Sequence, residues 1–215
     1  QIGSSGFTSP GGNFDVAPTF NIGSGGYQVL YMGEGVPRTT GLELPPSRTA
    51  YSITIGNPNG VILSGGGLAL TNSFVLTTGV LTTSDSNLLT LGTGITTPTA
   101  GSATSYVNGP LAVQVNSSTN ASKNFAIGSA VGWRPLVLGN FHSNGALQTY
   151  TARAIEGATG GTPAAPLVYL NSARYYRVEN TANIFTTSTA TIQLTYGADD
   201  IVGTPVTARV AQSDV

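Results

Sequence analysis

Few residues of this sequence have side chains that could catalyse a reaction or hold a metal ion. The chain of 215 residues has no cysteine and one histidine, His142, which lies among glycine and asparagine in a turn-like run. A catalytic triad needs a base within reach of its nucleophile, and we expect this lone histidine to be a solvated loop residue. Asp199 and Asp200 are the one adjacent pair of carboxylates. Such a pair can bind calcium, but a solvated turn is the more common arrangement, so we predict a protein that is no enzyme and has no metal site or cofactor.

Several large side chains in the second half of the chain are candidates for ligand contact. Trp133, Arg134 and Tyr176 combine aromatic faces, which stack on sugar rings, with a guanidinium that can bond to sugar hydroxyls. We predict them as possible contacts for a surface glycan. The alternative is that Trp133 packs inside a sandwich while Arg134 pairs with a carboxylate. Because Tyr175 and Tyr176 are consecutive in a strand-like run, they point to opposite faces, and at most one belongs to the core.

The composition excludes several classes of partner. Charged residues are 8% of the chain, against about 25% in typical soluble proteins. The net charge is −1, and no basic stripe is present that would bind nucleic acid. No apolar run is long enough to insert into a membrane. Thr, Ser, Asn and Gly take the place of charges, which is common in extracellular and cell-surface β-proteins, so we predict that location.

The stretch 51–95 is the most regular part of the sequence. Its apolar residues come in pairs that skip one position, which is the period of a strand with one buried face. Turn-forming residues separate the pairs. Positions 20 or 21 residues apart match each other, as in Ile55/Leu76, Leu70/Leu91 and Val61/Leu81. This interval predicts coils of a parallel β-helix, and the alternative is a β-meander in a sandwich.

The rest of the chain divides around this repeat. From residue 125 the strand-like runs are longer and lie between Gly, Pro and Asn, which favours an antiparallel sandwich. The predicted fold is therefore all-β, a short parallel β-helix or β-solenoid-like unit followed by an antiparallel β-sandwich. The predicted parts are an N-terminal arm and connection (1–50), the β-helix-like repeat (51–115), a boundary loop (116–124) and the sandwich (125–215).

The first 30 residues are dense in glycine, but they carry an aromatic residue at every sixth or seventh position, namely Phe7, Phe14, Phe20 and Tyr27. Glycine loses the most backbone freedom on folding, so such a segment does not order itself readily. One interpretation is a set of loops that cap the first coil. The other, which we adopt as a prediction, is an arm ordered by contact with another copy of the chain, with the four aromatics as assembly contacts.

Four segments occur in an order that resembles a known family: LSGGGLALTNSFVLTTGVLTTSDSNLLTLG, SATSYVNGPLAV, FAIGSAVGWRPLVLGNF, and a last part with YYRVEN, STATIQLTYGADD and ARVAQSD. This succession covers about residues 51–214. It resembles repeat modules of very large surface proteins of Bacteroidota that are exported by type IX secretion. The resemblance implies a β-helix-like repeat, a following β-sandwich, and non-catalytic adhesin, surface-layer or filament architecture outside the cell.

These observations lead to one favoured function. We expect a non-catalytic extracellular structural protein, a subunit or module of a bacterial surface filament or adhesin stalk. Its partners would be copies of itself, joined through β-strand contacts, because an unpaired strand edge is a template for another chain. The alternative is an adhesion module that binds glycans or another cell surface.

Overall fold

The computed structural model describes residues 18–20, 26–33, 35–95, 99–116, 122–142, 146–181, 190–200 and 210. Within these residues the chain forms strands, turns and loops and contains no helix. The strands make three sheets of seven, five and three strands. The predicted all-β class is therefore confirmed.

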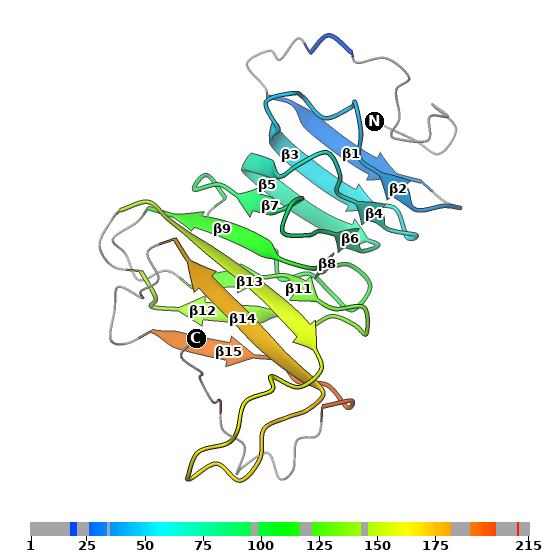
Figure 1. Ribbon diagram of the computed structural model, residues 1–215. Coiled ribbons are helices and arrows are strands. Elements are labelled where there is room, and N and C mark those ends of the chain that lie inside the picture. Colours follow the sequence, from blue (N-terminus) through cyan, green and yellow to red (C-terminus); the bar gives the residue numbers. More distant parts are fainter. Residues whose placement is uncertain are drawn as a thin grey trace.

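The N-terminal part is a β-solenoid of about four turns (Figure 1). Each turn contains one strand of a seven-stranded sheet, which we call the long sheet, and one short strand of the five-stranded sheet. All coil strands pair in parallel. The coil strands of the long sheet are β1 (Gln28–Met32), β3 (Thr49–Gly56), β5 (Leu68–Thr78), β7 (Leu89–Leu91) and β9 (Leu111–Val115). The short strands are β2 (Arg38–Thr39), β4 (Val61–Ile62), β6 (Leu81–Thr82), β8 (Val107–Asn108) and β11 (Ile127–Gly128).

The register of the coils matches the interval in the sequence. Ile55 lies opposite Leu76, Leu70 opposite Leu91, and Val61 opposite Leu81. Except for Leu76, which is partly buried, these side chains are at most 1% exposed. The coil interpretation is confirmed, because the residues expected to match lie opposite each other in parallel strands. The register is specific, since a slip of one residue would turn each row of apolar side chains towards solvent.

Tight corners allow the coils to stack closely. Gly79, between β5 and β6, has φ +87°, and a Cβ at this position would lie 1.7 Å from the carbonyl oxygen of Asn57 in the preceding turn. The fully buried Asn57 amide donates to the carbonyl of Val36 at 3.0 Å, one coil further back. Glycine and asparagine, which mark turns in the sequence, thus also join successive coils to one another.

The C-terminal part continues the long sheet and adds a second antiparallel layer. β13 (Gln148–Glu156) pairs antiparallel with β9, and β14 (Arg174–Asn180) pairs antiparallel with β13. The three-stranded sheet consists of β10 (Lys123–Phe125), β12 (Leu136–Gly139) and β15 (Thr191–Leu194). Figure 1 shows β12 and β15 behind β13 and β14. Apolar side chains of both layers join the coil interior in one core, where the Phe141 and Tyr150 rings meet edge to face at 4.6 Å.

Pairing in the sheets crosses both borders expected for the repeat unit. The first coil starts at Gln28, inside the segment expected to be an arm and connection, and β11 extends the five-stranded sheet beyond 116–124. The first coil is hard to see in the sequence because its short strand, Arg38–Thr39, has no apolar residue. Among the described residues, no helix is long and apolar enough to cross a membrane.

Candidate functional site

The long sheet ends in two edge strands, β1 and β14. Within the described residues, β1 pairs only with β3, and β14 pairs only with β13. The strands from β1 to β9 are parallel, and the two following antiparallel steps restore the direction. β1 and β14 therefore run in the same direction at opposite edges of one sheet.

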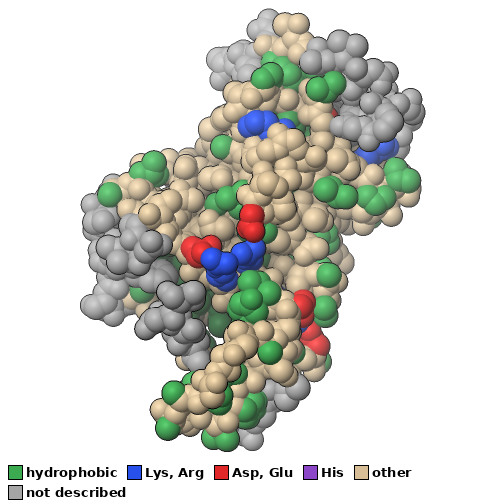
Figure 2. All heavy atoms as spheres, in the orientation of Figure 1, with side chains coloured by type: hydrophobic (Ala, Val, Ile, Leu, Met, Phe, Trp, Pro, Cys, Tyr) green, Lys and Arg blue, Asp and Glu red, His purple; other side chains and the backbone are tan. Residues whose placement is uncertain are grey.

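The two edge strands differ in charge. β1 has the sequence QVLYM and contains no charged residue. β14 contains Arg174, which pairs with carboxylates of the ionic network, and Arg177 and Glu179, which form an ion pair with each other. Figure 2 shows that charged side chains form only a few small groups on the visible face. Large apolar side chains are exposed in the first two coils and in the loop before β14: Val36, Leu42, Tyr51, Ile62, Val168 and Tyr169.

The aromatic residues expected to mediate assembly are only partly accounted for. Phe7 and Phe14 lie outside the described residues. Phe20 and Tyr27 contact each other edge to face, with ring centroids 5.2 Å apart. The Tyr27 hydroxyl donates to the carbonyl of Glu43 at 2.6 Å, so Tyr27 packs on its own chain.

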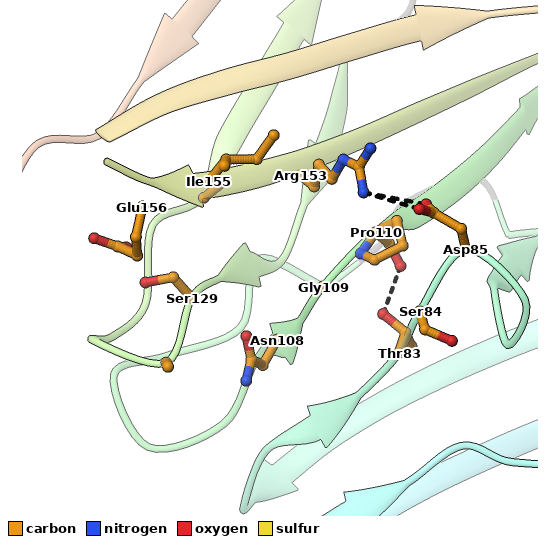
Figure 3. Close-up of a pocket in the computed structure, with 12 residues that line it drawn as sticks. Thr83, Ser84, Asp85, Asn108, Gly109, Pro110, Ser129, Arg153, Ile155 and Glu156 are labelled. Atoms are coloured by element: carbon orange, nitrogen blue, oxygen red, sulfur yellow. Dashed lines mark hydrogen bonds and ion pairs between the residues drawn. The ribbon is translucent and has the colours of Figure 1, made fainter. Parts of the chain in front are cut away.

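An open cleft lies where β13 passes the turns that follow β6, β8 and β11 (Figure 3). Its volume is about 390 Å³. The polar and charged residues that line it are Thr83, Ser84, Asp85, Asn108, Ser129, Arg153 and Glu156. None of the predicted ligand residues lines this cleft. The sequence indicates turns at Asp85 and Asn108, but only the coil register and the pairing of β13 bring them beside Arg153.

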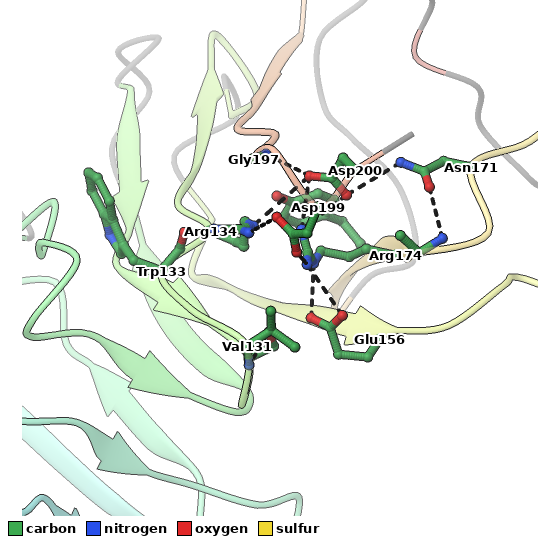
Figure 4. A network of polar contacts seen from close by, with 12 residues as sticks. Val131, Trp133, Arg134, Glu156, Asn171, Arg174, Gly197, Asp199 and Asp200 are labelled. Atoms are coloured by element: carbon green, nitrogen blue, oxygen red, sulfur yellow. Dashed lines mark hydrogen bonds and ion pairs between the residues drawn. The ribbon is translucent and has the colours of Figure 1, made fainter. Parts of the chain in front are cut away.

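The three predicted ligand residues do not form a common surface. The half-buried Trp133 donates from Nε1 to the carbonyl of Ala100 at 3.1 Å, and its ring points away from the Arg134 side chain (Figure 4). Tyr176 lies on the inner face of β14 and donates to the carbonyl of Thr195. Burial raises the pKa of Tyr176 to about 12. Its neighbour Tyr175 is on the opposite face of the strand, as alternation predicts.

Arg134 instead belongs to an ionic network that closes the antiparallel part. It pairs with Asp199, while Arg174 binds Glu156 at 2.9 Å, Asp200 at 2.9 Å and also Asp199. The side chains of Arg174 and Asp200 are only 1% and 4% exposed. The expected turn is present and Asp199 is 37% exposed, but Asp200 is not solvated, because arginines from other segments reach these carboxylates (Figure 4).

The network determines the charge state of its members. Hydrogen bonds from Arg174 lower the pKa of Glu156 and of Asp199. Burial alone would lower the pKa of Arg174, but hydrogen bonds to Glu156 and Asp199 raise it above its ordinary value. These pKa shifts favour the charged forms of Glu156, Asp199 and Arg174.

Two further polar residues are in the core rather than in solvent. His142 is fully buried, its Nδ1 lies 3.2 Å from the Tyr150 hydroxyl, and its Nε2 has no partner among the described residues. The prediction of a solvated histidine is wrong, since the loop turns inward beside Phe141. Lys123 is also buried, and burial lowers its pKa. Around His142, the described residues show no hydrogen bond to a carboxylate or a serine hydroxyl.

The comparisons with known proteins identify no relative. No family model matches the chain, and neither curated proteins nor solved structures match it. The class of protein that the fold defines is therefore a short β-solenoid continued by antiparallel sheet. The resemblance to Bacteroidota surface modules stays a prediction from the sequence.

Proposed function

We propose that this protein is a non-catalytic structural subunit or module of an extracellular bacterial filament or adhesin stalk. In this proposal, copies join end to end through the long sheet. The observation that supports this proposal is that the edge strands β1 and β14 run in the same direction at opposite edges of one sheet.

The joint would form when β14 of one copy pairs in parallel with β1 of the next. β1 has five residues and β14 has seven, so a ladder can extend over the whole of β1. Each added strand continues the right-handed twist of the sheet. Because the two surfaces differ, the contact is heterologous and does not close on itself, and repetition gives a filament.

The properties of the two ends support such a joint. Natural edge strands are commonly protected from pairing by charges, proline or bulges, but β1 has no charged residue and no proline. Apolar side chains are exposed in segments next to both strands in the chain: Val36, after β1, is 52% exposed, and Val168, before β14, is 87% exposed. Their burial would contribute about 25 cal/mol per Å² of apolar surface.

A charge on the edge strand tests this proposal. Leu30 is at the centre of β1 and faces away from the buried Val29 and Tyr31. We expect Leu30→Lys to weaken self-association up to about fivefold, since this lysine would lie beside Arg177 of β14 in the joint, and like charges directly opposite each other are destabilising. The readouts are sedimentation velocity over a concentration series and electron microscopy of the assembled protein.

The matched control is Val75→Lys. Val75 is 43% exposed on β5, an interior strand whose two edges are already paired. This variant should assemble like the unmodified chain. A chain that stays monomeric at high concentration, or equal behaviour of the two variants, would contradict the proposal.

A further inference from the structure

We propose that the cleft between β13 and the corner of the coil binds a neutral sugar unit of a surface glycan. This would be a function in addition to self-assembly. No residue of β1 or β14 lines the cleft, so the site does not use the strand edges that would join copies of the chain.

The coil side of the cleft has a fixed geometry. The register aligns Thr82, Asn108 and Gly128 in three successive coils, so the turns that follow them stack. Gly109 has φ +125°, and a Cβ at this position would lie 2.5 Å from the carbonyl oxygen of Thr83. The Thr83 hydroxyl donates to the carbonyl of Pro110 at 2.7 Å. The turns are thus held together before any ligand binds, which reduces the entropic cost of binding.

The opposite side is the C-terminal half of β13, which carries Arg153 and Glu156 (Figure 3). Arg153 Nη1 lies 3.2 Å from both carboxylate oxygens of Asp85. The remaining guanidinium nitrogens of Arg153 make no hydrogen bond to a described residue, and the same holds for the Asn108 side-chain amide. These groups are available as donors to a ligand.

The mixture of groups favours a polyol. Sugar hydroxyls both donate and accept hydrogen bonds, so they can pair with the carboxylates of Asp85 and Glu156 and with the donors of Arg153 and Asn108. The half-buried Ile155 adds apolar surface for the C–H face of a sugar ring. Asp85 is ion-paired with Arg153 and Glu156 with Arg174, so these four groups have no net charge that would favour an anion or a metal cation over a neutral ligand. A volume of about 390 Å³ is within the range of small-molecule sites, about 300–1,000 Å³.

The fixed position of Glu156 adds to this argument. Its carboxylate receives hydrogen bonds from Arg174 Nε at 2.9 Å and from Nη2 at 3.3 Å. The ionic network therefore holds this acceptor at the rim of the cleft. Asp85, 77% exposed and paired with Arg153, is the acceptor at the other end.

The test is ligand-observed NMR of the full chain with glucose, galactose, mannose and N-acetylglucosamine, each as the methyl glycoside. Glucuronate, inorganic phosphate and calcium are the comparison ligands. We expect at least one neutral sugar to bind with a Kd of about 1 mM or tighter. Arg153→Met and Asn108→Ala should each weaken this binding about tenfold, because each removes hydrogen bonds to the ligand.

Arg177→Met is the matched control. Arg177 lies directly opposite Arg153 on β14 but outside the cleft, and it pairs with Glu179. Its loss should change sugar affinity by less than about twofold. Absence of binding by all four sugars, or binding of the comparison ligands alone, would overturn the proposal. The proposal would also be overturned if a cleft variant that keeps the native circular dichroism spectrum binds sugar with unchanged affinity. Self-association of the same two variants tests the strand-edge proposal separately.

Discussion

Arg174 and Asp200 form an ion pair of 2.9 Å whose side chains are 1% and 4% exposed. One residue opens β14, and the other lies in the turn after β15. Their contact therefore ties the long sheet to the second layer of the antiparallel part. Glu156 and Asp199 complete the surroundings of the guanidinium.

Removal of Arg174 should strongly destabilise the protein. In Arg174→Met, the nearly buried Asp200 loses its main counter-charge, and we expect the free energy of unfolding to fall by about 3–5 kcal/mol. Urea unfolding followed by circular dichroism measures this change. Arg177→Met is the control, because Arg177 and Glu179 are each 50% exposed and their pair should contribute no more than about 1 kcal/mol. If the two variants lose similar free energies of unfolding, the ionic network does not stabilise the fold more than an exposed ion pair does.

Acid should weaken the same network. The pKa values of Glu156 and Asp199 are lower in the folded protein than their ordinary values of 4.5 and 3.8. Between the folded and unfolded pKa values the unfolded chain binds more protons, so the stabilisation is complete above the ordinary values and is lost as pH falls through the lower folded values. Urea unfolding from pH 7 to pH 3 should show a smaller acid-dependent loss in Arg174→Met than in the unmodified chain. An identical pH profile in the two proteins would contradict this prediction.

The buried pair of His142 and Tyr150 allows a third prediction. Tyr150→Phe keeps the ring contact with Phe141 but removes the hydroxyl that lies 3.2 Å from His142 Nδ1. A buried polar group without its partner costs about 1–3 kcal/mol, and we expect a loss of that size in urea unfolding. Tyr196→Phe is the control, since Tyr196 is 60% exposed. If both substitutions prove neutral, the histidine has another hydrogen-bond partner.

The coil could be predicted from the sequence because its contacts repeat at a short interval. Leu70 and Leu91 are 21 residues apart and lie opposite each other in neighbouring strands. The spacing of buried residues in the sequence therefore gives the length of one coil directly. The alternation of Tyr175 and Tyr176 was predictable for the same reason, because side chains of a strand alternate between its faces.

The ionic network and the cleft could not be predicted in this way. Arg134 and Asp199 are 65 residues apart, and no periodicity connects them. Their contact depends on how three antiparallel strands pack over the end of the coil. The prediction for His142 is wrong because local composition indicates a turn, whereas its burial depends on the Tyr150 ring and hydroxyl in a later strand. The cleft joins Asp85 and Arg153, which only the pairing of β13 with β9 brings together.

Disulfide trapping tests the central claim of end-to-end sheet addition most directly. The chain has no cysteine, so an engineered pair can react only with itself. Leu30 and Arg177 are the central residues of β1 and β14, and both face outward. We expect the double variant Leu30→Cys/Arg177→Cys to give a ladder of covalent oligomers under mild oxidation, on non-reducing gels. Each single variant should give dimers at most, and the control Val75→Cys/Arg177→Cys should give no ladder. If the first double variant forms only dimers or stays monomeric while the chain assembles, β14 does not meet β1 of the next copy, and the proposed joint is wrong.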